Sequence, residues 1–145
     1  MELKDPIEEA KRYYDNAKTI LKEKAIKDGD FYTDSKYVKM AGDTAWKGCL
    51  IAMDSVFGIK KKTRKSIDDY KAEASKKDKK LLQYVVSGYN TLHLYMGYDG
   101  EKGYKIATFG MDNAKSIISW CESRRPNALS GIKPKRRTPA RKTDK

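Results

Sequence analysis

The sequence predicts an all-α fold, an up-and-down bundle of four long helices and one short helix, followed by a disordered basic C-terminal tail. Apolar residues recur at steps of three and four along most of the first 123 residues, and no stretch shows a convincing β-strand pattern. Residues 124–145 are basic and lack an apolar period over most of their length. We therefore expect one domain over residues 1–123 and a tail over residues 124–145.

The first long helix is expected to begin after Asp5, which can cap it, with Pro6 at its first position. It should end near residues 28–29, where the chain reads Asp-Gly. The next start signal follows at Thr33 or Asp34. One apolar stripe runs along this first helix and comprises Ile7, Ala10, Tyr14, Ala17, Leu21 and Ala25.

The second helix, residues 35–57, is apolar on more than one side, which is typical of a helix at the centre of a bundle. Its small residues should let a neighbouring helix approach closely, and Gly58 can form its C-terminal cap. These small residues are Ala41, Gly42, Ala45 and Gly48.

Three further helices are expected in the second half of the chain. Ser66 can cap a short helix over residues 67–75, and Asp78 can cap a long one that ends at residues 97–100. The last helix should begin near Lys105 and end before Pro126.

Positive charge is concentrated in two segments. The net charge is +12, of which residues 60–80 contribute +6 and residues 124–145 contribute +8, whereas residues 1–59 and 81–123 each contribute −1. Two basic segments on a nearly neutral body indicate an anionic partner, and nucleic acid is the commonest such partner. The expected phosphate contacts are Lys60, Lys61, Lys62, Arg64, Lys65, Lys133, Lys135, Arg136, Arg137, Arg141 and Lys142.

Tyrosines flank several expected turns and have two interpretations. Aromatic rings beside basic segments can stack on nucleic-acid bases, and they can equally cover the ends of a helical bundle. The sequence leaves open whether the 98–104 loop lies at the same end of the bundle as Phe31 and Tyr32. The tyrosines concerned are Tyr32, Tyr37, Tyr95, Tyr98 and Tyr104.

The sequence predicts no catalytic residue, no metal site and no cofactor. The single histidine, His93, has no carboxylate three or four positions away to orient its ring, so we expect a structural role for it. Cys49 and Cys121 fit no metal-binding spacing and should be reduced and buried. The charged N-terminus and the absence of a run of about 20 apolar residues predict a cytoplasmic protein with no membrane partner.

Three stretches, residues 10–18, 37–46 and 87–95, resemble HEPN-like helical bundles, in particular a small bacterial family without an assigned function. The resemblance covers about residues 5–122 and implies a helical scaffold that pairs as a homodimer. Active HEPN domains are metal-independent ribonucleases in which an Arg, after four to six intervening residues, is followed by a His. If His93 held that place, the Arg would fall at residues 86–88, which are Val-Ser-Gly, so the resemblance does not imply this activity.

The sequence therefore predicts a non-enzymatic, cytoplasmic helical bundle that binds RNA or DNA through its two basic segments. One alternative is a protein-interaction or regulatory module whose tail solubilises it or docks onto an acidic partner protein. A third hypothesis is that the chain is a divergent ribonuclease that uses His93.

Overall fold

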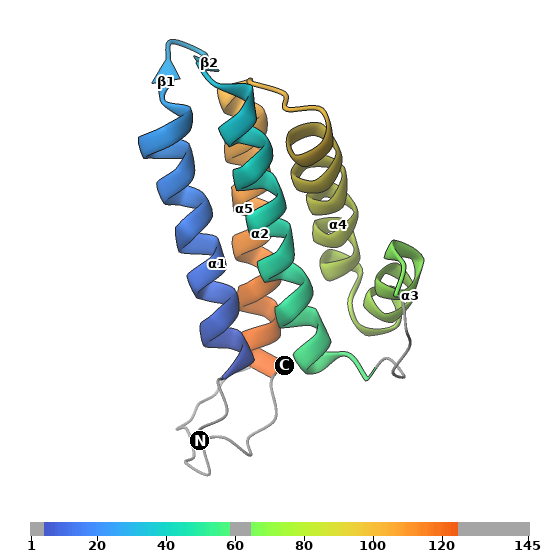
Figure 1. Ribbon diagram of the computed structural model, residues 1–145. Coiled ribbons are helices and arrows are strands. Elements are labelled where there is room, and N and C mark those ends of the chain that lie inside the picture. Colours follow the sequence, from blue (N-terminus) through green and yellow to red (C-terminus); the bar gives the residue numbers. More distant parts are fainter. Residues whose placement is uncertain (1–4, 59–64, 125–145) are drawn as a thin grey trace.

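The computed structural model describes residues 5–58 and 65–124 and is almost entirely helical there, which confirms the all-α class. The elements are α1 (Pro6–Ile20), η1 (Leu21–Ala25), β1 (Lys27–Asp28), β2 (Phe31–Tyr32), α2 (Ser35–Val56), α3 (Ile67–Lys77), α4 (Lys79–Gly88), η2 (Tyr89–Tyr98) and α5 (Tyr104–Arg124). The rods formed by α1–η1, α2, α4–η2 and α5 lie side by side, with α3 set apart at one end (Figure 1). The expected fourth long helix consists of the ten-residue α4 and a π-helical continuation, η2.

The first rod begins as the sequence predicts but ends differently. The Asp5 carboxylate accepts a hydrogen bond from the Ile7 N–H at 3.0 Å, which confirms the N-terminal cap. The prediction of a single helix that ends near residues 28–29 is wrong, because the rod becomes π-helical at Leu21 and ends at Ala25. Most of the predicted stripe is buried, with Tyr14 only partly so.

A short β-hairpin follows, which corrects the expectation that the chain holds no strand. Lys27 pairs with Tyr32 and Asp28 with Phe31 in antiparallel register. Two residues connect the strands, and the first, Gly29, has a φ of +68°. Glycine adopts this left-handed conformation without steric cost, which allows the tight reversal.

Helix α2 is the centre of the bundle, as its two apolar faces predict, and it packs against α1, α5 and η2. Asp34 caps its N-terminus by accepting a hydrogen bond from the Lys36 N–H at 3.0 Å. The expected cap at Gly58 is wrong: the helix ends at Val56, Phe57 is extended, and Gly58 is not among the glycines with positive φ.

The small residues of α2 admit close neighbours, which confirms that prediction. A Cβ atom added at Gly42 would lie 2.5 Å from the Leu92 carbonyl oxygen and 2.6 Å from the Met96 Cβ, both on η2. A Cβ at Gly48 would lie 3.0 Å from the Ala10 carbonyl oxygen on α1. Glycine is therefore required where α2 crosses η2.

The predicted caps at Ser66 and Asp78 are confirmed. Ser66 and Asp69 form a reciprocal capping box at the start of α3, and the Asp78 carboxylate accepts from the Lys80 N–H at 2.8 Å. Helix α3 packs mainly against α4 at one end of the bundle, so it does not span it (Figure 1). Asp54 connects this region to α2 by accepting hydrogen bonds from Tyr70 at 2.8 Å and from Lys65 at 3.1 Å.

The hairpin and the loop before α5 meet at the opposite end of the bundle. The Tyr32 N–H donates to the Lys102 carbonyl at 2.8 Å, and the Tyr104 N–H donates to the Asp30 carbonyl at 2.9 Å. The question that the sequence left open is thereby answered: Tyr104 and its loop share an end with Phe31 and Tyr32.

Cys49 and Cys121 are free and buried, as predicted. Burial raises the pKa of both thiols. Among the described helices, none has the length and apolar character needed to cross a membrane.

Candidate functional site

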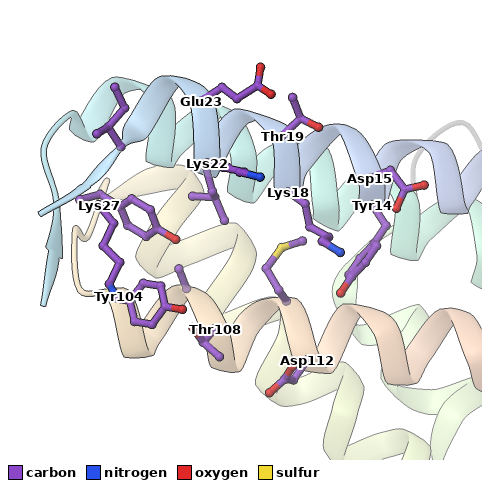
Figure 2. A pocket seen from close by; sticks show the side chains of 15 residues that line it. Tyr14, Asp15, Lys18, Thr19, Lys22, Glu23, Lys27, Tyr104, Thr108 and Asp112 are labelled. Atoms are coloured by element: carbon purple, nitrogen blue, oxygen red, sulfur yellow. The ribbon is translucent and has the colours of Figure 1, made fainter. Parts of the chain in front are cut away.

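A groove of about 850 Å³ runs between α1–η1 and α5 and reaches the hairpin. Its size falls within the range of about 300–1,000 Å³ that is typical of ligand sites in proteins. The groove exists because α1 and α5 both pack against α2 and contact each other less extensively. Its aromatic and charged lining residues are Tyr14, Asp15, Lys18, Lys22, Glu23, Lys27, Tyr32, Tyr104 and Asp112 (Figure 2).

One end of the groove, beside the hairpin, combines lysines with tyrosines; we call it the lysine–tyrosine end (Lys22, Lys27, Tyr32 and Tyr104). The Lys27 Nζ lies 4.4 Å from the centre of the Tyr104 ring, a cation–π contact. The Tyr32 and Tyr104 ring centres are 5.9 Å apart. Burial, and then Tyr104, raise the pKa of Tyr32, so its phenol stays protonated at neutral pH.

The other end, which we call the carboxylate end, is formed by Tyr14, Asp15 and Asp112. Burial is the main cause that raises the pKa of Tyr14, and the charges of Asp112 and Asp15 raise it further. The protonated phenol can therefore donate a hydrogen bond into the groove. Lys18 lies over the Tyr14 ring, with its Nζ 5.6 Å from the ring centre.

The charges of the groove are available to a ligand. In the part of the chain that the structure describes, Lys18, Lys22 and Lys27 form no ion pair with a carboxylate. Figure 2 shows the Glu23 carboxylate directed away from α5, whereas the Lys22 ammonium lies along α1 in the direction of Lys18. The lysine–tyrosine end is therefore cationic although the lining as a whole is balanced.

Of the eleven phosphate contacts expected from the sequence, only Lys65 lies within the described residues. Its ammonium is 3.1 Å from the Asp54 carboxylate, an ion pair that competes with any phosphate contact. The other ten, in the 60–64 connection and in the tail, lie outside the described residues, and their assignment stays a prediction.

The groove was not predicted from the sequence, although Tyr32 and Tyr104 were expected beside turns. One signal was available: Tyr14, Lys18 and Lys22 recur at steps of four and so share a helical face. The lysines were overlooked because residues 1–59 carry almost no net charge.

His93 lies away from the groove, in a separate cavity of about 210 Å³ that Lys65 and Tyr70 also line. Its ring stacks on that of Tyr89 with the centres 5.2 Å apart. No cluster of His, Cys, Asp and Glu suited to a metal ion occurs within residues 5–58 and 65–124.

The family of this chain follows from a match over residues 5–123 to the model described as Domain of unknown function (DUF5618). The chain belongs to the DUF5618 family. The match ends before the last 22 residues, 124–145. The expectation of a family without an assigned function is thereby confirmed. The family description does not mention HEPN domains, so that part of the resemblance stays a prediction.

The fold of this DUF5618 member has a solved counterpart. A protein of unknown function from Dyadobacter fermentans is 48% identical, and the match covers 86% of this chain and 99% of that chain with a TM-score of 0.80. The comparison with curated proteins gave no match.

Proposed function

We propose that this chain is a non-enzymatic binding module for single-stranded RNA or DNA. The observation that carries the proposal is the lysine–tyrosine end of the groove, where Lys22 and Lys27 lie beside Tyr32 and Tyr104. Proteins that bind single strands combine a cationic groove, which follows the phosphates, with aromatic rings on which bases stack.

Exposure and charge support this assignment. The Tyr104 side chain is 37% exposed and can offer ring surface to a base, whereas Tyr32 is buried beneath it. The lysines without carboxylate partners can contact phosphates, and the net charge of +12 favours the approach of a polyanion. The basic residues of the 60–65 connection and of the tail are proposed to extend the contact.

The lining of the groove does not favour catalysis. It contains no histidine or cysteine, and two of its three tyrosines have a pKa raised by burial above the ordinary phenol value, so their phenols are protonated at neutral pH and can donate but not accept a proton. His93 lines a different cavity.

A second candidate function is a protein-interaction module, and the exposed apolar side chains favour it. Phe31, Tyr98 and Phe109 are 58%, 78% and 53% exposed. A second copy of the chain, as the HEPN resemblance implies, or another protein could cover them. Association that survives high salt would favour this function over nucleic-acid binding.

Replacing Lys22 and Lys27 together by alanine is expected to weaken binding of a labelled single-stranded RNA. On a single strand each lost phosphate contact reduces the slope of log affinity against log salt by about 0.7, so the double variant should lose about 1.4. The measurement is fluorescence anisotropy with the full chain at several salt concentrations.

The matched control is the double variant Lys36→Ala with Lys47→Ala. Both lysines are exposed on α2, outside the groove, and Lys36 lies over the Tyr37 ring much as Lys27 lies over Tyr104. The control should keep most of the slope. Equal losses in the two double variants would show that only overall charge matters and would contradict a role for the groove.

A further inference from the structure

The two ends of the groove carry side chains of opposite charge, which would orient a ligand that has one anionic end. We infer that the groove binds one nucleotide in a single orientation, with its phosphate at the lysine–tyrosine end and its base at the carboxylate end, so that the base stacked on Tyr104 belongs to the adjacent nucleotide. The carboxylate end should prefer bases that carry an amino group. The inference rests on the proposed function and specifies which parts of a nucleotide the two ends of the groove contact.

The orientation follows from charge. Asp15 and Asp112 would repel a phosphate, and they form no ion pair or hydrogen bond with a side chain in the part of the chain that the structure describes. Lys22 and Lys27 attract the phosphate to the other end. Lys18, which covers the Tyr14 ring, lies between Lys22 and Tyr14 in Figure 2 and partly offsets the carboxylates.

The carboxylate end can distinguish bases by their hydrogen-bonding edges. Asp112 on α5 and Asp15 on α1 both border this end of the groove. Figure 2 shows the Tyr14 hydroxyl directed toward α5 and the Asp112 carboxylate at the outer edge of α5. A carboxylate accepts a hydrogen bond from an amino group, such as the N4 amino group of cytosine. It repels a carbonyl oxygen in the same place, which uracil presents as O4.

Cytosine and uracil oligomers provide a matched pair of probes. Ten-nucleotide strands of each carry the same charge and the same ring size, so phosphate contacts and stacking are nearly equal. We expect the full chain to bind oligocytidylate at least about fivefold more tightly than oligouridylate in anisotropy at neutral pH.

Substitution of the carboxylates locates the preference. Asp112→Asn should reduce the affinity ratio to less than about twofold, because an amide can both donate and accept and so pairs with either base. Asp99→Asn, an exposed position outside the groove, is the control and should preserve the ratio. Circular dichroism of each variant verifies that it is folded.

The outcomes separate the inference from the proposed function. Equal affinity for the two oligomers, or a preference that persists in both Asp15→Asn and Asp112→Asn, would overturn the inference. If Lys22→Ala with Lys27→Ala still weakens both oligomers in that case, the proposed function stands. If neither oligomer binds at low salt, both the inference and the proposed function are overturned.

Discussion

Replacing Trp46 by alanine is expected to lower the free energy of unfolding by about 3–5 kcal/mol, the usual cost of removing a buried large aromatic side chain. Trp46 is 6% exposed on α2, the helix that contacts most of the others. Its indole packs edge-on against Tyr89, with the ring centres 5.8 Å apart. Urea denaturation followed by circular dichroism measures the loss.

Trp120→Ala is the matched control, because Trp120 is the only other tryptophan and is partly exposed. Its indole N–H donates to the Asp78 carboxylate at 3.2 Å. Losing this hydrogen bond and some packing should cost about 1–2 kcal/mol. Equal losses for the two variants would contradict the central position assigned to α2.

Replacing Gly42 by alanine is expected to destabilise the fold by about 1–3 kcal/mol, the typical cost of overpacking a core. The added methyl group would lie 2.5 Å from the Leu92 carbonyl oxygen, so α2 and η2 must separate. This cost exceeds the gain of at most about 1 kcal/mol that alanine brings to a helix interior. The same denaturation experiment measures it.

Gly58→Ala serves as the control for Gly42→Ala. A Cβ atom at Gly58 meets nothing within 4 Å, and Gly58 does not have a positive φ. Its substitution should change stability by no more than about 0.5 kcal/mol. A Gly42→Ala variant as stable as this control would show that the crossing of α2 and η2 is looser than described.

The helix starts could be predicted because their causes are local. Asp5, Asp34, Ser66 and Asp78 each satisfy backbone N–H groups within three residues of themselves, and the sequence displays this pattern directly. The apolar stripes likewise depend only on helical spacing. These signals were sufficient to predict the helical class and the positions of most helices.

The π-helical segments and the hairpin could not be predicted in the same way. An apolar stripe of given spacing does not distinguish an α-helix from a π-helical continuation such as η2, which meets Gly42 of another helix. The hairpin strands have two residues each, too few for an alternating pattern, and Tyr32 and Tyr104 bond to partners on the other segment. Both features depend on contacts between distant parts of the chain.

The groove was missed for a related reason. Its lining comes from residues 14–32 and 104–112, and only folding brings α1 and α5 together. Residues 14–32 contain four lysines and four acidic residues, so their charges sum to zero, although the Glu23 carboxylate is directed away from α5 (Figure 2). The dense basic runs at residues 60–65 and in the tail are visible in the sequence itself, and of their predicted phosphate contacts only Lys65 lies within the described residues.

The most direct test of the account is fluorescence anisotropy of a labelled ten-nucleotide single-stranded RNA with the full chain at about 50 and 200 mM salt. Contact with three or more phosphates predicts binding at the lower salt and a loss of at least about tenfold in affinity at the higher salt. Absence of binding at about 50 mM salt would contradict the nucleic-acid function.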